Sequence, residues 1–188
     1  DGDAASYFDR AISGGHLAAK FEPANILAAG QGVSANTARA VELCQETADA
    51  DHPGALYSMG AIYAAGELKP RDMSRAATYF RKAAEKGQAD AAYNLGLMMV
   101  EGTGVEKHPA GALEFFQFAA AEGLAEAQTA LAFLYANGTG VEKSDEKAAT
   151  WFNEAALRGD TLAQQRLNRK SNGLNSSPSQ QSRMPSSA

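Results

Sequence analysis

DAAYNLGLMMVEGTGVEKHPAGALEFFQFAAAEGLA, residues 90–125, is one copy of a pattern that runs through most of the chain. Residues 126–161 repeat it as EAQTALAFLYANGTGVEKSDEKAATWFNEAALRGDT, so each column recurs after 36 residues. A fixed period of this size is the signature of stacked structural repeats, and it predicts a solenoid. The columns that keep the period without gaps include Gly66, Gly102 and Gly138; Ala76, Ala112 and Ala148; Phe80, Phe116 and Phe152; and Gly87, Gly123 and Gly159.

Each copy has the pattern of two helices joined by a glycine-containing loop. Ala91, Leu95 and Met99 recur at helical spacing, two glycines interrupt, and a second apolar stripe follows. Gly87, Gly123 and Gly159 follow second helices, where a left-handed residue commonly ends a helix. We predict an all-α protein, a right-handed α-solenoid of antiparallel helix pairs with a 36-residue repeat. The predicted N-cap positions of the second helices are Asn36, Asp72, His108 and Ser144.

The register of the repeat also divides the chain. Gly15 lies in the Gly87 column, so the chain starts inside a repeat. From residue 171 the chain turns to Ser, Asn, Gln and Pro without periodicity, which is typical of disorder. The predicted parts are the second helix of a truncated repeat (1–17), four repeats (18–53, 54–89, 90–125 and 126–161), a capping helix (162–170) and a disordered Ser/Pro/Gln tail (171–188).

A column of small residues predicts how the two helices of a repeat cross. Gly60, Gly96 and Ala132 occupy it in the first helices. Because they remove side-chain bulk, the helices can approach closely, and the phenylalanine column of the second helices fills the space behind.

Charge and hydropathy argue against two classes of partner. The 188 residues carry 17 Lys+Arg and 22 Asp+Glu, a net charge of −5. A nucleic-acid surface needs a basic face, so we expect no nucleic-acid partner. No apolar run reaches about 18 residues, so we expect no direct membrane insertion. Residues 161–188 hold basic but no acidic residues, which leaves an acidic body that favours a basic or neutral partner.

The compartment is not fixed by the sequence. The chain begins at Asp1 without a methionine or a signal peptide, so we expect its native N-terminus to lie upstream. The bacterial periplasm, secretion and the cytoplasm all stay open.

Candidate catalytic and metal-binding residues do not group together. His16 and His52 are one repeat apart, but later repeats hold other residues in that column, and no cysteine stands nearby at ligand spacing. Cys44 replaces phenylalanine in the aromatic column, so we predict a buried thiol. The Gly-Thr-Gly-Val turns at 102–105 and 138–141 lack the Gly-Lys-Ser/Thr of a phosphate loop. We therefore predict no enzyme activity, no cofactor and no metal site.

These columns resemble the Sel-one-like repeat, a relative of the tetratricopeptide repeat. The residues that carry the resemblance are Ala91-x-x-x-Leu95-Gly96-x-x-Met99-x-x-Gly102-x-Gly104-Val105 and then Ala112-x-x-x-Phe116-x-x-x-Ala120-x-x-Gly123. The resemblance covers about residues 4–170. Two units depart from it: Pro23 falls mid-helix, and Gly66-Glu67-Leu68-Lys69 replaces Gly-x-Gly-Val.

The resemblance implies a noncatalytic scaffold or adaptor for protein–protein interaction, with roles in bacterial signalling, assembly or cell-envelope regulation. An alternative comes from a cysteine-rich branch linked to β-lactam binding and hydrolysis. That branch staples each helix pair with a disulfide, which Cys44 alone cannot form. A third reading is a passive structural spacer between flanking domains.

The resemblance also implies a binding surface. In tetratricopeptide-like stacks the first helices line a concave face, with inward positions at i, i+4 and i+7. Here that stripe is aromatic and apolar, which suits an extended peptide or a partner helix. The predicted partner-binding residues are Phe21, Asn25, Tyr57, Ala61, Tyr93, Asn94, Leu97 and Phe133.

Two further expectations concern this stripe. The alternative to a groove is that its aromatic side chains pack as core against neighbouring first helices. Tyr57, Tyr93 and Thr129 stand where a lysine would be needed to hold a peptide's C-terminal carboxylate, so we expect no such clamp at these positions.

Overall fold

The computed structural model describes residues 37–66 and 68–175, and helices account for most of them. No strand occurs within these two ranges. The helices are α3 (Thr37–Asp49), α4 (Pro53–Ala65), α5 (Met73–Glu85), α6 (Ala89–Glu101), α7 (Pro109–Ala121), α8 (Ala125–Asn137), α9 (Asp145–Leu157) and α10 (Thr161–Asn175).

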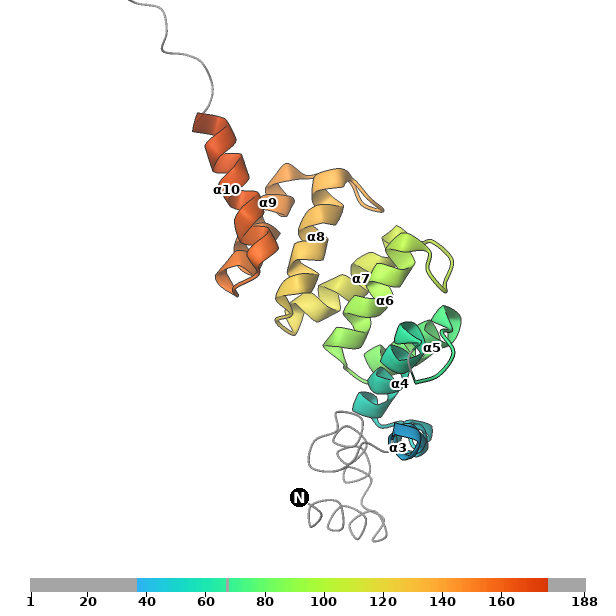
Figure 1. Cartoon of the computed structure of the whole chain (residues 1–188). Helices are drawn as coiled ribbons and strands as arrows, with labels where there is room; N and C mark the ends of the chain where they lie inside the picture. Colours follow the sequence, from blue (N-terminus) through green and yellow to red (C-terminus); the bar gives the residue numbers. More distant parts are fainter. Residues whose placement is uncertain (1–36, 67, 176–188) are drawn as a thin grey trace, which may run out of the picture.

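Successive helices form pairs that stack in chain order. α4 packs on α5, α6 on α7 and α8 on α9, and each second helix also contacts the first helix of the following pair. Figure 1 shows the stack running from α3 at one end to α10 at the other. α10 contacts α9 as α6 contacts α5, so it stands in the place of a first helix. The prediction of an all-α solenoid of helix pairs is confirmed.

The small column and the phenylalanine column meet as predicted. A β-carbon built on Gly60 would lie 2.7 Å from the Phe80 ring, and one built on Gly96 would lie 2.7 Å from the Phe116 ring. Phe116 is 1% exposed, so its ring fills the space that the missing side chain leaves. The close approach of the paired helices therefore depends on glycine at these crossings.

The core is divided along the stack. Buried residues from α3 to α8 form one cluster that includes Leu43, Leu95 and Phe116. A smaller cluster at the C-terminal end joins Phe152 of α9 and Ala163 of α10 to α8. No repeat buries its apolar face alone, so the stacking of neighbours supplies most of the stability.

The second glycine of each Gly-x-Gly-Val loop permits a close backbone contact. Gly104 lies against the Met73 carbonyl at the start of α5, and Gly140 lies against Pro109 at the start of α7. Both glycines have positive φ, 73° and 69°. A side chain here would clash with the preceding repeat, which explains the motif. Leu68 occupies this column in the departing loop, and its side chain is 41% exposed.

Two of the four predicted N-caps are confirmed. Asp72 Oδ1 accepts a hydrogen bond from Arg75 N at 3.0 Å, and Ser144 Oγ accepts one from Lys147 N at 3.2 Å. His108 occupies the equivalent position before α7, but its side chain makes no capping bond. Asn36 lies outside the described residues. Gly87, Gly123 and Gly159 have positive φ, as predicted for residues that follow a second helix.

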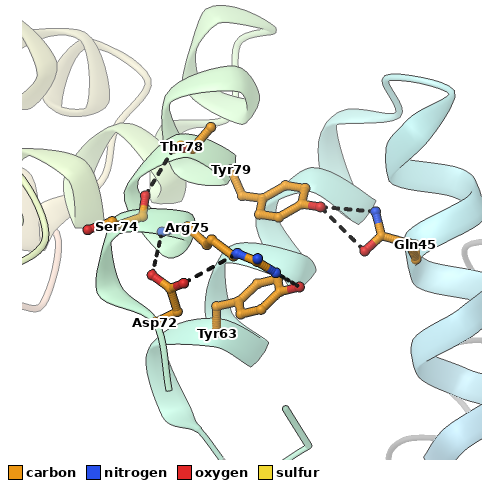
Figure 2. Close-up of polar contacts among 7 residues, drawn as sticks. All are labelled: Gln45, Tyr63, Asp72, Ser74, Arg75, Thr78 and Tyr79. Carbon is orange, nitrogen blue, oxygen red and sulfur yellow. Dashed lines mark hydrogen bonds and ion pairs between the residues drawn. The ribbon is translucent and has the colours of Figure 1, made fainter. Parts of the chain in front are cut away.

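Consecutive second helices are joined by side-chain contacts that recur with the repeat. Tyr79 of α5 exchanges hydrogen bonds with Gln45 of α3, the shorter at 2.9 Å (Figure 2). One repeat later, Arg81 of α5 lies over the Phe115 ring of α7, 6.0 Å from its centroid. Tyr63 of α4 stacks on Tyr79, which ties the first helix to the same contact.

The C-terminal end differs from its prediction. α10 runs to Asn175, so the prediction that helical structure stops at residue 170 is wrong. Once a helix is nucleated, each added residue gains a backbone hydrogen bond that roughly offsets the entropy lost in fixing it, so polar residues can extend the helix. The expectations for residues 1–17, for Pro23 and for residues 176–188 fall outside the described residues.

Candidate functional site

The described residues of the predicted stripe lie on first helices. We call the side of the stack formed by α4, α6, α8 and α10 the first-helix face. Tyr57 and Ala61 come from α4, Tyr93 and Leu97 from α6, and Phe133 from α8. All five side chains are half-buried. Phe21 and Asn25 lie outside the described residues.

Each stripe aromatic of the described repeats rests on the phenylalanine behind it. The ring centroids are 5.7 Å apart for Tyr57 and Phe80, 5.9 Å for Tyr93 and Phe116, and 5.1 Å for Phe133 and Phe152. These tilted and edge-on geometries are favourable for aromatic pairs. One part of each ring therefore packs on the core, while another part stays accessible.

Thr129 does not belong to the accessible stripe. It is 4% exposed, and its hydroxyl has no hydrogen-bond partner among the described residues. Its short side chain does not extend past the packed helices as a tyrosine at the same position does. The interpretation of Thr129 as an inward-facing surface residue is wrong.

A cavity of about 420 Å³ opens on the first-helix face between α4 and α6, and we call it the α4–α6 cavity. It brings together four predicted residues, whereas Tyr93 and Phe133 are not among its lining residues. The residues around it are Tyr57, Ala61, Ala64, Ala65, Met73, Phe80, Asn94, Leu97, Met98, Glu101 and Thr103. Most of the lining is apolar; apart from Tyr57 of α4, the polar side chains come from α6 and the loop after it.

The polar groups of the α4–α6 cavity are partly fixed by their neighbours. Asn94 Nδ2 donates to the Asp90 carbonyl at 2.9 Å, which holds the amide against its own helix. Thr103 Oγ1 donates to Glu101 Oε2 at 3.4 Å, which orients this carboxylate. The cavity thus offers an amide and an oriented carboxylate beside an apolar surface.

The first helices of the described repeats carry only negative charge. α4, α6 and α8 contain no lysine or arginine, and their acidic residues are Asp90, Glu101 and Glu126. Burial raises the pKa of Tyr93, and the charges of Glu126 and Asp160 raise it further. Its hydroxyl therefore remains a neutral hydrogen-bond donor.

A second cavity, of about 380 Å³, lies between α8, α9 and α10, and we call it the α8–α10 cavity. Its lining residues are Ala136, Asp145, Ala148, Ala149, Phe152, Arg166, Leu167 and Arg169. Five of them are two repeats on from residues of the α4–α6 cavity: Ala136, Asp145, Phe152, Arg166 and Arg169 correspond to Ala64, Met73, Phe80, Asn94 and Leu97.

Arg166 and Arg169 were not among the predicted site residues, because residues 162–170 have the pattern of a polar end cap. The signal was present, since the two arginines continue the Asn94 and Leu97 columns. What the sequence did not show is that α10 packs on α9 as a further first helix.

The remaining chemical groups do not form a site in the described part of the chain. No group of three His, Cys, Asp or Glu side chains there is arranged to hold a metal ion. Cys44 is 3% exposed, so the predicted buried thiol is confirmed, and burial raises its pKa. His52 Nδ1 accepts from Ala55 N at the start of α4. In residues 37–66 and 68–175, no helix has the length and hydropathy needed to cross a membrane.

Helix pairs of equal length, stacked in register with an aromatic face on the first helices, define a solenoid repeat protein. Residues 24–52, 53–88, 89–124 and 125–160 match the Sel1 repeat. The chain belongs to the Sel1 repeat family, whose members are generally scaffolds for protein interaction and typically noncatalytic.

Several solved bacterial structures are similar to the chain. A Sel1 repeat protein from Oxalobacter formigenes is 29% identical, with a TM-score of 0.83 over 95% of this chain and 74% of that one. A protective antigen with an SLR fold from uropathogenic Escherichia coli is 27% identical, with a TM-score of 0.85. The match covers 93% of this chain but 38% of the antigen, so the chain spans little more than a third of it.

A more distant similarity is to an immunity protein from Pseudomonas aeruginosa, 26% identical with a TM-score of 0.56 over 85% of this chain and 58% of that one. A comparison with curated proteins finds no match.

Proposed function

We propose that the chain is a noncatalytic interaction module that binds an extended protein segment along the first-helix face, which is concave in stacks of this class. The observation that carries this is the α4–α6 cavity, around which Tyr57, Ala61, Asn94 and Leu97 meet. An apolar hollow with a few placed polar groups suits an apolar side chain, with the peptide backbone held at the rim.

The construction of the stripe favours tight recognition. Tyr57, Tyr93 and Phe133 are each held by a phenylalanine of the core. A side chain that is already immobile loses little conformational entropy when a partner binds. Rigid aromatic groups of this kind are the usual energetic centres of protein interfaces.

A bacterial protein partner agrees with the similar structures, which are bacterial and include an immunity protein. We infer a role in bacterial signalling, assembly or cell-envelope regulation, with partner choice set by the exposed columns of the repeats. The first helices α4, α6 and α8 add no positive charge, so this part of the face suits neutral or basic residues of the partner.

Selection of a phage-displayed random dodecapeptide library against the full chain tests this proposal. We expect the bound peptides to share an apolar residue. Ala61→Leu adds bulk inside the α4–α6 cavity, so it is expected to abolish capture of these peptides. Ala121→Leu is the matched control, since Ala121 is exposed at the end of the second helix α7. Circular dichroism checks that both variants keep their helices.

Three results would count against the proposal. Peptides captured equally by the wild type and by folded Ala61→Leu would place binding elsewhere. A selection without any shared apolar residue would favour the passive spacer. Sustained turnover of a chromogenic β-lactam, retained through repurification, would favour the hydrolase alternative, for which we expect no signal above background.

A further inference from the structure

The α8–α10 cavity repeats the geometry of the α4–α6 cavity with different chemistry. Both lie between two first helices and in front of a core phenylalanine, Phe80 in one case and Phe152 in the other. Figure 1 shows α10 against α9 at the end of the stack. Arg166, Leu167 and Arg169 of α10 line the second cavity. The first-helix face therefore extends one helix beyond the four matched repeats.

The columns that line the rim change from neutral to cationic. Arg166 stands in the column of Asn94, and Arg169 stands in the column of Leu97. The two arginines are three residues apart on α10, so their side chains project from the same side of the helix. α10 contains no acidic residue.

The guanidinium groups are not neutralised by the surrounding structure. Among the described residues, neither Arg166 nor Arg169 forms an ion pair with an acidic side chain. Asp145 also lines the α8–α10 cavity, and its carboxylate lies 4.0 Å from Lys143 Nζ. The cavity wall thus holds two unpaired cations and one paired anion.

We propose that the α8–α10 cavity binds an acidic side chain, Asp or Glu, of the same peptide whose apolar residue occupies the α4–α6 cavity; this proposal rests on the function proposed above. The planar guanidinium group matches a carboxylate with two parallel hydrogen bonds. Phe152, Ala148 and Leu167 supply an apolar surface for the methylene groups of that side chain. The charge at this end of the chain is therefore opposite in sign to the charge of its acidic body.

The spacing of the two cavities sets the spacing of the peptide residues. Packed helices lie about 8–10 Å apart, and the two cavities are separated by two steps from one first helix to the next, which gives roughly 20 Å. An extended chain advances about 3.3 Å per residue. The apolar and acidic residues of the partner are therefore expected about six residues apart.

The dodecapeptide selection tests this inference in a second arm. We expect the wild-type chain to enrich peptides with an acidic residue about six positions from the shared apolar residue. Against Arg166→Gln/Arg169→Gln, the acidic residue is expected to disappear from the enriched peptides while the apolar residue stays. Lys82→Gln/Lys107→Gln removes the same charge from two exposed positions outside the first helices and is expected to leave the enrichment unchanged.

Fluorescence anisotropy of one enriched peptide gives the magnitude. Replacing its acidic residue by glutamine is expected to weaken binding to the wild type roughly tenfold, the range of a hydrogen-bonded charge pair. The same replacement is expected to have no effect on binding to Arg166→Gln/Arg169→Gln. Arg166→Lys/Arg169→Lys keeps the charge without the planar fork and is expected to restore part of the affinity.

The outcomes separate the two proposals. If the enriched peptides share the apolar residue but carry no acidic residue, or carry a basic residue at the acidic position, this inference is overturned and the proposed function stands. Loss of the apolar residue as well would overturn both. An acidic preference that persists in Arg166→Gln/Arg169→Gln would place the carboxylate site outside the α8–α10 cavity.

Discussion

The α4–α6 and α8–α10 cavities are built from the same columns of the repeat, two repeats apart, yet they differ in the residues that face outward. Phe80 and Phe152 lie at the back of the two cavities. At their rims, Asn94 and Leu97 give way to Arg166 and Arg169. The columns that pack the helices therefore keep the backbone arrangement, and the exposed columns are free to vary, so one scaffold presents different chemistry along one face.

The largest expected effect concerns the shared packing. Phe116→Ala removes a ring that is 1% exposed in the middle of the stack, and we expect a loss of about 3–5 kcal/mol in the free energy of unfolding. Phe152→Ala near the end of the stack is expected to lose less, about 2–3 kcal/mol, because the smaller cluster around it can relax. Urea denaturation followed by circular dichroism measures both. Equal losses would show that the two regions are packed alike.

The helix crossing can be tested by adding one methyl group. A β-carbon at Gly96 would lie 2.7 Å from the Phe116 ring, so Gly96→Ala is expected to destabilise the chain by about 1–3 kcal/mol in urea denaturation, although alanine favours helix. Gly111→Ala is the matched control, since its β-carbon would meet the movable ends of Met99 and His108. A neutral Gly96→Ala would contradict the close crossing.

Much of this packing was predictable from the chain, because it repeats. The column of Gly60 and Gly96 predicted contact with the phenylalanine column. Asp72 and Ser144 were predicted as caps from their residue type and position. Such features depend on local chemistry that recurs in every copy. A column shared by several repeats can therefore be read without knowing the tertiary structure.

The features that sequence analysis missed depend on what each repeat touches. Thr129 shares a column with Tyr57 and Tyr93, yet it is buried because its side chain is short. Arg166 and Arg169 lie beyond the recognisable repeats, and only the packing of α10 on α9 places them at a cavity. The period places the residues of one column at equivalent positions. Their environments still differ when the side chains differ in length or when a residue lies at an end of the stack.

A smaller difference in stability is expected between N-cap substitutions in neighbouring repeats. Ser144 caps α9, whereas His108 at the equivalent position makes no capping bond before α7. We expect Ser144→Ala to lower the free energy of unfolding by about 1 kcal/mol. His108→Ala is expected to change it little, and thermal or urea denaturation of the pair gives the comparison. If both substitutions cost the same, the capping bond of Ser144 contributes nothing.

The difference in charge between the two cavities predicts one substitution that strengthens peptide binding as well as substitutions that weaken it. Asp145 is the anion in the wall of the α8–α10 cavity. Its neutralisation in Asp145→Asn is expected to strengthen binding of an acidic dodecapeptide about two- to threefold in fluorescence anisotropy, with the gain shrinking at high salt. A weaker complex would indicate that Asp145 contacts the peptide backbone and does not oppose the acidic side chain.

The smallest expected effect is a pH dependence of the free energy of unfolding, which arises from Cys44 in the larger core cluster. Burial raises the pKa of the Cys44 thiol above its ordinary value of 9.0. Above pH 9 the thiol of the unfolded chain loses its proton, whereas the folded chain still keeps it. The free energy of unfolding therefore includes this contribution in full below pH 9 and loses it as the pH rises. We expect the stability gap between the wild type and Cys44→Ala to narrow between pH 8 and pH 10. A constant gap would contradict this linkage.

The use of the first-helix face can be mapped directly by photo-crosslinking. A selected dodecapeptide is synthesised with photo-leucine in place of its apolar residue, irradiated with the full chain and analysed by mass spectrometry. We expect crosslinks to the lining of the α4–α6 cavity, which consists of residues within 57–65 and 94–103 together with Met73 and Phe80. Crosslinks confined to α7 and α9, or to residues of α5 other than Met73 and Phe80, would contradict it.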